Sequence, residues 1–335
     1  MKRFLCVLLA AASLFAEDSY FCEPDCSWSV AAEWLYFMPS FDQNAFIWDG
    51  SDTINGGVSK RASRIGEKQR YYSAYRIEAS YEFCRCIQGL TARFTDFHQD
   101  YSDKVFVNPG TQLIGAPFQG VLTANPGSVF FERDYRYYNI VGLADIFGTL
   151  FCRLNTTFSA GVKFVHLHIK ERGNFTNFDN ANAFQFVDPD MRAWALGPCA
   201  QVKGGLPLIH CIGLKARFLF GMLADNSLSK TTTSGGPQAN QNGSRYSVKN
   251  SPKLWRVMNS MEGRLGLNFE KRCCLPVCRS FMNIEVEGGY EFLREERMIS
   301  RIYFPIEGAG DYGFSWNNWS DFTLNGPYMR INLSY

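Results

Sequence analysis

The sequence has little net charge, few histidines and, after its first 16 residues, no long apolar run. Its 34 Lys and Arg residues nearly balance 32 Asp and Glu residues, which argues against the strongly basic surface of nucleic-acid-binding proteins. No later segment approaches the about 20 apolar residues that a membrane-spanning helix needs. A hydrophobic share of 46% argues against a disordered chain, because so many apolar residues can bury a large surface on folding.

Catalytic motifs are also scarce. We find no nucleophile elbow and no phosphate-binding loop, and the sequence holds only 4 histidines. Asp96 and His98 form the one pairing of a carboxylate with an imidazole that suits acid–base chemistry, and no second carboxylate pair evidently faces it. We therefore expect no enzymatic activity and no cofactor, and a protease is the alternative that this pair leaves open.

The N-terminus indicates the compartment. Lys2 and Arg3 precede the apolar stretch 4–15, and Ala16 is followed by polar residues, which is typical of a secretory signal peptide. Cleavage near Ala16 removes Lys2, Arg3 and Cys6. It leaves 32 basic and 32 acidic residues, and ten of the 11 cysteines. An even number of cysteines in an oxidising compartment favours disulfides.

Two-residue alternation of apolar and polar side chains dominates the rest of the chain and predicts strands with one apolar face. Many of the expected strands exceed the about 5–6 residues common in globular sheets, and no capped helical stripe appears after the signal peptide. The ten expected strands span residues 28–38, 71–83, 89–97, 134–147, 154–164, 192–203, 213–224, 254–269, 282–292 and 321–335.

The connections between these strands favour a membrane barrel over a soluble sandwich. Long segments (39–70, 98–133, 171–191, 225–253 and 293–320) alternate with short ones (around 84–86, 148–153, 204–212 and 271–280), as in an outer-membrane barrel with long outer loops and short periplasmic turns. The last strand alternates up to the terminal Tyr335, a pattern expected to engage the barrel-assembly machinery. We predict an all-β, transmembrane, antiparallel up-and-down barrel of about ten strands, or twelve or more if long loops hide further pairs.

The two faces of the strands predict a lipid-facing surface and a charged lumen. We expect outward-facing aromatics to form interface girdles, with Tyr71, Tyr135, Tyr137, Trp255, Phe269 and Tyr335 as anchors next to outer-membrane lipid and lipopolysaccharide. Buried charges must be paired or hydrated, so the lumen is a salt-bridged plug, a water-filled passage, or both. The expected lumen-lining residues are Glu33, Arg76, Glu78, Glu82, Arg93, Lys163, Lys215, Arg217, Arg256, Glu262, Arg264, Glu285, Glu287, Glu291 and Arg330.

Three of these glutamates, Glu285, Glu287 and Glu291, share one face of a strand. They are expected to stand opposite a basic row on the strands at 213–224 and 254–269, so that a transverse electric field crosses a narrow pore. The competing interpretation is a structural ladder of ion pairs without conduction.

The mature cysteines are expected to lie at the periplasmic rim, where some link to other chains or to cysteine-rich envelope proteins. They are Cys22, Cys26, Cys84, Cys86, Cys152, Cys199, Cys211, Cys273, Cys274 and Cys278. Zinc binding is the competing interpretation, but the spacings are not those of a zinc ribbon and an oxidising periplasm disfavours free thiolates. We therefore expect no metal.

Several short segments resemble the major-outer-membrane-protein family of Legionella, which also occurs in chlamydia-related bacteria. They are 32–37 (AEWLYF), 159–164 (SAGVKF), 193–198 (AWALGP) and 288–291 (GGYE). The resemblance implies a β-barrel, porin activity and a cell surface held partly by disulfides. The Gly-Pro element here continues into Cys199 rather than a basic residue, and the cysteine-rich rim favours a chlamydia-type envelope.

The sequence thus predicts three segments: a signal peptide (1–16), a periplasmic segment with Cys22 and Cys26 (17–27), and a barrel in the bacterial outer membrane (28–335). The expected function is a porin-like channel for small hydrophilic solutes with a disulfide-linked structural role. The alternative is a non-conducting surface barrel that acts as an adhesin or antigen through its long loops.

Overall fold

The computed structural model describes most of the chain from Ser27 onward. The described residues are 27–40, 47–50, 53–54, 57–58, 63–65, 70–83, 89–106, 112–115, 121–123, 126–151, 154–177, 184–209, 211–235, 245–250, 256–274, 281–303 and 316–335. The expected signal peptide and the segment with Cys22 and Cys26 lie outside these residues, apart from Ser27. Among the described residues, no helix is long and apolar enough to cross a membrane.

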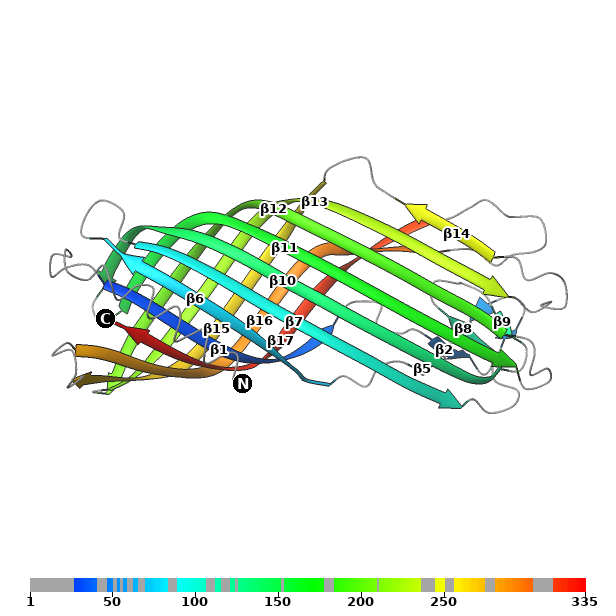
Figure 1. Ribbon diagram of the computed structural model, residues 1–335, viewed down its shortest axis with the longest axis horizontal. Helices are drawn as coiled ribbons and strands as arrows, with labels where there is room; N and C mark the ends of the chain where they lie inside the picture. The colour runs from blue at the N-terminus through cyan, green and yellow to red at the C-terminus, as the bar shows by residue number, and fades with distance from the viewer. Residues whose placement is uncertain are drawn as a thin grey trace.

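Ten strands form a closed antiparallel barrel (Figure 1). Around the ring, β12, β11, β10, β7, β6, β1, β17, β16, β15 and β13 pair in that order, and pairing of β12 with β13 closes it. The strands are β1 (Ser27–Ser40), β6 (Tyr72–Glu82), β7 (Gly89–Phe106), β10 (Pro126–Phe151), β11 (Leu154–Asn177), β12 (Phe184–Ile209), β13 (Ile212–Gly235), β15 (Arg256–Cys274), β16 (Phe281–Tyr303) and β17 (Trp316–Ser334). The expected barrel of ten strands is confirmed.

The chain ends pair with each other and leave no open edge. Ser29 lies opposite Ser334 and Glu33 opposite Arg330, so β1 and β17 run side by side along the wall. Both strands meet at the end where the short segments 83–88, 152–153, 210–211 and 275–280 connect neighbours. Closure satisfies the backbone groups that lipid cannot pair. We call this the terminal end and the opposite end the far end.

Most strands continue well beyond their expected limits toward the far end. β10 and β12 each contain 26 residues, whereas a tilted strand crosses a membrane in about 9–11 residues. The expected loops 98–133, 171–191, 225–253 and 293–320 are therefore partly wrong, because much of each is strand. The connection between β11 and β12 shrinks to 178–183.

A reversal of polarity explains why these strand extensions were missed. On β10, Ile140 faces outward and is 49% exposed, whereas Tyr137 and Tyr135 face inward and are fully buried. Beyond Tyr138 the outward positions are Arg136, Asp134 and Glu132. The alternation keeps its phase, but apolar side chains move from the outer face to the inner face. Tyr135 and Tyr137 are therefore interior residues, and their assignment as interface anchors is wrong.

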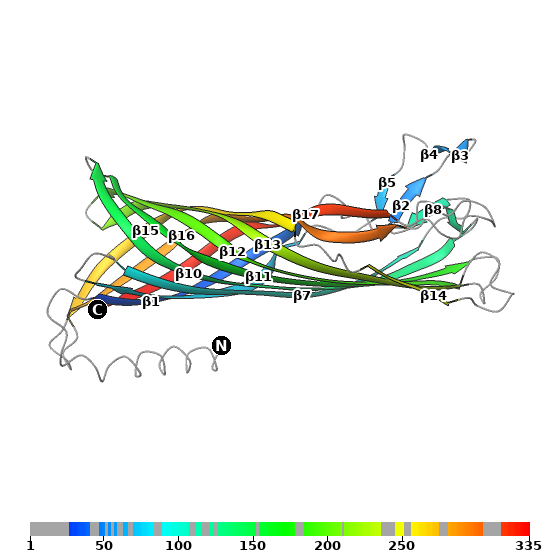
Figure 2. The same cartoon turned by 90° about the horizontal axis from the view of Figure 1, so that it is seen from above.

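Several short strands lie at the far end, outside the ring of ten. β2 (Ile47–Gly50), β5 (Ser63–Ile65), β8 (Gln112–Gly115) and β9 (Val121–Thr123) form one sheet that joins two long inter-strand segments (Figure 2). β14 (Arg245–Asn250) pairs with the end of β13. β3 (Thr53–Ile54) and β4 (Gly57–Val58) form a further pair.

Candidate functional site: the interior of the barrel

A layer of paired charges crosses the interior, and Glu33 on β1 is its first hub. Its Oε2 accepts a hydrogen bond from Arg76 Nη1 at 2.9 Å, and its Oε1 accepts from Arg264 Nη1 and Arg330 Nη1 at 2.8 Å each. Arg76 also donates two hydrogen bonds, of 2.6 and 2.7 Å, to Glu291 on β16. One connected group of ions therefore ties several strands together across the lumen.

Glu78 extends this hub toward β13. Its two oxygens accept from Arg330 Nη2 at 2.9 Å and from Arg217 Nη1 at 3.0 Å. On the other side, Arg264 Nη2 donates to Glu287 at 3.3 Å, and the Tyr328 hydroxyl donates to the same carboxylate.

A second hub centres on Glu262 of β15. Arg93 Nη2 and Lys163 Nζ each donate to it at 2.6 Å. Lys163 also donates to Ser260 Oγ at 2.6 Å and to Glu295 at 3.0 Å, so all three donor hydrogens of the ammonium have an acceptor. Lys163 and Glu295 have no exposed side-chain surface. Solvent therefore does not pass through this hub in the structure.

An apolar layer fills the interior next to the charged one, toward the far end. All ten barrel strands contribute to it, and each member is nearly or fully buried. Its members are Leu35, Phe37, Ala74, Phe97, Tyr135, Tyr137, Val165, Leu167, Ile169, Met191, Ala193, Ala195, Leu223, Met258, Leu293, Met298, Ile299, Phe322, Leu324 and Tyr328.

Side chains from opposite walls touch within this apolar layer. The rings of Tyr137 on β10 and Phe322 on β17 lie 5.4 Å apart, although these strands are not neighbours in the ring. The Ser300 amide on β16 donates to Met191 Sδ on β12 at 3.0 Å. Tyr137 also donates to Glu295 at 2.9 Å and thereby joins the two layers. The described interior is thus a two-layer plug, not a water-filled passage.

The structure places most of the expected lumen residues in this plug. Buried or nearly buried in the interior are Glu33, Arg76, Glu78, Arg93, Lys163, Arg217, Glu262, Arg264, Glu285, Glu287, Glu291 and Arg330. Lys215 and Arg256 are inward-facing but partly exposed, and they pair with Glu285 and Asp225. Glu82 is exposed near the terminal end, where it accepts a bond from Ser27 Oγ at 2.8 Å.

The acidic residues expected to set up a transverse field pair directly with basic residues. Glu285, Glu287 and Glu291 do share one face of β16, but each carboxylate contacts a cation directly. The cations come from β13, β15 and β6, so the acidic and basic rows interlock instead of facing each other across a gap. Direct pairing lowers the field that a solute would meet.

Several interior groups were missed by the sequence analysis. Glu295 is in phase with Glu291 on the same strand, but the expected strand ended at Phe292. Tyr137 and Asn139, which donates to Glu262 at 3.2 Å, were hidden by the assignment of Tyr137 to the lipid face. The two-residue alternation places each of these residues on the inner face of its strand. The sequence indicates this only when the reversal of polarity is taken into account.

Two cysteines have described side chains, and one of them is not at the rim. Cys199 is buried in the middle of β12, inside the barrel, where it packs with Val141, Leu143 and Leu219. The rim position expected for Cys199 is wrong, because β12 continues to Ile209. Cys211 is exposed at the terminal end, and neither cysteine forms a disulfide. Cys273 and Cys274 end β15, and the other expected disulfide residues lie outside the described part.

The imidazole considered for acid–base chemistry lies on the outward face of the wall. His98 Nε2 is 3.3 Å from Asp134 Oδ1 and 3.4 Å from Asp100 Oδ1, and the side chain is 47% exposed. These three residues could offer ligand atoms to a cation, but exposed acidic groups often do so without binding one. Asp96, the expected partner, is not its partner in this set.

Comparison with known proteins fits this architecture. The family model described as "Legionella pneumophila major outer membrane protein precursor" matches residues 22–335. The chain belongs to this family. This match confirms the resemblance to the Legionella-type family found in the sequence. It places the chain in the bacterial outer membrane as a porin-like protein. No match to a curated individual protein was found.

Solved structures of outer-membrane barrels show weaker likeness. The outer membrane protease OmpT from Escherichia coli has 8% identity and a TM-score of 0.43, with 95% of this chain and 99% of that chain covered. A major outer membrane protein from Thermus thermophilus has 9% identity and a TM-score of 0.31, with 92% and 99% covered. A Pseudomonas aeruginosa FadL homologue has 7% identity and a TM-score of 0.26, with 93% and 90% covered.

Proposed function

We propose that this family member is a porin-like channel that is closed at rest and passes small hydrophilic solutes when its plug rearranges. The observation that carries the proposal is the shared pairing in the charged layer. Glu33 has three cationic partners and Glu262 has two. A carboxylate that loses one partner keeps another. Partner exchange therefore avoids an unpaired charge in the dry interior, which would be strongly unfavourable.

The charged layer also favours transport over a purely structural role. A well-packed apolar interior of similar volume is often as stable as buried ion pairs. A barrel that needed only stability could therefore extend its apolar layer through the membrane. Charged walls instead suit a hydrophilic solute, and the close approach of opposite walls limits that solute to a small size.

Recordings in planar bilayers test this proposal with a matched pair of variants. Phe322→Ala removes a fully buried ring from the apolar layer, whereas Phe292→Ala removes a lipid-facing ring that is 41% exposed. The wild type and Phe292→Ala are expected to open rarely and briefly. Phe322→Ala is expected to open at least several times more often. Absence of steps in all three proteins, once shown to be folded, would contradict a channel.

The apolar layer itself favours a second candidate, a non-conducting surface barrel. Residues such as Phe97, Phe322 and Leu324 have no exposed surface, and the sheet β5-β2-β8-β9 lies at the far end. In this case the far end acts as an adhesin or antigen. Loss of binding to host cells after removal of β8 and β9, together with silent bilayers, would support it.

A disulfide-linked role in the envelope completes the proposal. It is supported by Cys211, an exposed thiol at the terminal end. We expect the rim cysteines to connect neighbouring chains, and Cys199 to take no part. Non-reducing gels of isolated envelopes should show high-mass bands that collapse to monomer with reductant; a monomer band without reductant would contradict this role.

A further inference from the structure

Outward-facing side chains on β7, β10, β11 and β12 differ in polarity from one cross-strand row to the next. The register pairs Phe94 with Ile140, Ile140 with Phe164, and Phe164 with Leu196, which forms an apolar row. One step toward the far end, the row is Asp96, Tyr138, His166 and Trp194, and the rings of Tyr138 and His166 stack at 4.7 Å. Such amphipathic aromatic rows mark the edge of the lipid hydrocarbon.

The next row toward the far end is basic on all four strands. The register places His98, Arg136, His168 and Arg192 side by side. Arg136 and Arg192 are 58% and 59% exposed. Because this row follows the aromatic edge directly, it meets the level of lipid headgroups.

The two arginines are held in the same way. Asp134 accepts from Arg136 Nε and Nη2 at 3.3 and 3.0 Å, and Asp190 accepts from Arg192 Nε and Nη2 at 3.3 and 3.2 Å. Nη1 of each guanidinium has no side-chain partner among the described residues. Each arginine is therefore oriented by a carboxylate two residues earlier and keeps one edge free for a further acceptor.

Asp190 stays ionised in this arrangement. Burial opposes ionisation, but hydrogen bonds from Arg192 and from His168, whose Nε2 lies 2.9 Å away, hold the pKa of Asp190 below its usual value. His168 thus connects the two arginine sites from the strand between them. Arg136 and Arg192 lie two strands apart, which corresponds to about 10 Å because neighbouring strands lie about 4.8 Å apart.

We infer that this row binds a lipid of the outer leaflet whose headgroup carries two phosphates, one at Arg136 and one at Arg192. Guanidinium groups suit phosphate because they donate two parallel hydrogen bonds. The acyl chains would lie on the apolar row that includes Ile140 and Leu196, both 49% exposed. The nearby carboxylates repel free anions, so binding needs both phosphates and the acyl contacts.

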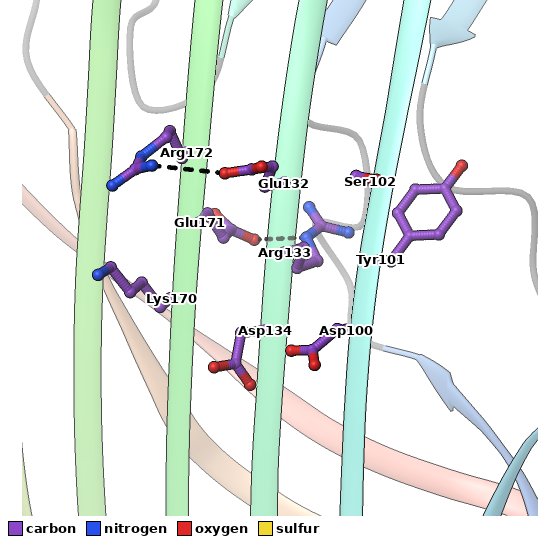
Figure 3. Close-up of a pocket in the computed structure, with 9 residues that line it drawn as sticks. All are labelled: Asp100, Tyr101, Ser102, Glu132, Arg133, Asp134, Lys170, Glu171 and Arg172. Carbon is purple, nitrogen blue, oxygen red and sulfur yellow. Dashed lines mark ion pairs between the residues drawn. The ribbon is translucent and has the colours of Figure 1, made fainter.

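A hollow next to the row is lined by outward-facing residues and by the inward-facing Tyr101, Arg133 and Glu171. It has a volume of about 350 Å³ and lies on β7, β10 and β11. Figure 3 shows Asp100, Asp134 and Lys170 in one row across these strands, with the ion pair of Arg172 and Glu132 beyond them. Lys170 and Arg172 add cationic donors for sugar and phosphate oxygens.

Native mass spectrometry of the purified full-length protein in neutral detergent tests this inference. The probes are bisphosphorylated lipid A, monophosphorylated lipid A and inorganic phosphate. We expect the bisphosphorylated lipid to bind at least about tenfold more tightly than the monophosphorylated one, and inorganic phosphate to show no binding. Equal affinity for both lipids would overturn the two-phosphate assignment, and binding of inorganic phosphate alone would indicate an anion site instead of a lipid site.

Variants locate the site. The double variant Arg136→Gln/Arg192→Gln should lose the preference for the bisphosphorylated lipid. Arg294→Gln is the matched control, because Arg294 is also an outward arginine on a carboxylate, Asp321, and is 48% exposed. The control should bind like wild type. Unchanged binding by the double variant, or by Arg192→Gln alone if the double variant does not fold, would overturn the inference.

Discussion

At the scale of single residues, the plug depends on ions that have no access to water. Lys163 is the sharpest case, because three acceptors surround a fully buried ammonium group. Lys163→Met should lower the free energy of unfolding by about 3–5 kcal/mol, since it leaves buried carboxylates without this cation. Urea titration in lipid vesicles measures it.

The matched control for this change is Lys170→Met on the outward face of the same strand. It should shift the free energy of unfolding by less than about 1 kcal/mol, as expected for exposed charges. Equal effects of the two substitutions would contradict a dry charged layer.

A close approach of two strands makes a second residue-scale prediction. A Cβ at Gly161 would lie 1.8 Å from the Gly142 carbonyl oxygen, whereas a Cβ at Gly205 would have no atom within 4 Å. Gly161→Ala should lower the free energy of unfolding by about 1–3 kcal/mol through overpacking. Gly205→Ala should change it by less than about 0.5 kcal/mol. Similar stabilities of both variants in urea titration would contradict this packing.

The sequence predicts the direction of interior residues but not their partners. Alternation alone places Arg76 and Glu291 on the inner face. It does not pair them, because 215 positions separate them and the closure of the ring brings them together. The same holds for Arg93 and Glu262, which approach across the lumen.

At the scale of elements, the reversal of polarity marks where the lipid ends. Val162 is outward, 59% exposed and within the apolar region. Leu228 is outward on β13 and lies opposite Arg192, beyond the reversal. Val162→Arg should lower the free energy of unfolding in vesicles by about 2–4 kcal/mol, and Leu228→Arg by less than about 0.5 kcal/mol. An equal loss at both positions would place the lipid boundary elsewhere.

An irregularity in β16 gives a second element-scale prediction. The register of β16 and β17 shifts between Glu295 and Ile299, and Arg297 has φ of 55° there. Arg297→Gly should raise the free energy of unfolding by about 1–2 kcal/mol, because glycine adopts this conformation without strain. Glu296→Gly, outside the positive-φ position, should lower it by about 0.5–1 kcal/mol. A loss of stability in both variants would argue against strain at Arg297.

The reversal also explains how much of each strand the sequence predicts. Strand centres between the lipid edges follow one rule, apolar out and charged in, and were found. Beyond Tyr138 the rule inverts, so Tyr135 and Tyr137 were misplaced, and the strands were ended too early. The short strands at the far end have little alternation of their own and depend on pairing between distant segments.

At the scale of the whole molecule, the central claim is that two stacked layers close the barrel at rest. Cys199 tests this claim, because it is buried inside the barrel whereas Cys211 is exposed at the terminal end of the same barrel. The two thiols therefore compare the interior with the solvent in one molecule.

The most direct measurement is the rate at which a membrane-impermeant maleimide labels each thiol in reduced, folded protein, followed by site-resolved mass spectrometry. A closed interior predicts complete labelling of Cys211 while Cys199 stays unlabelled, and similar rates for both after unfolding. Labelling of Cys199 and Cys211 at the same rate in the folded barrel would contradict the closed interior.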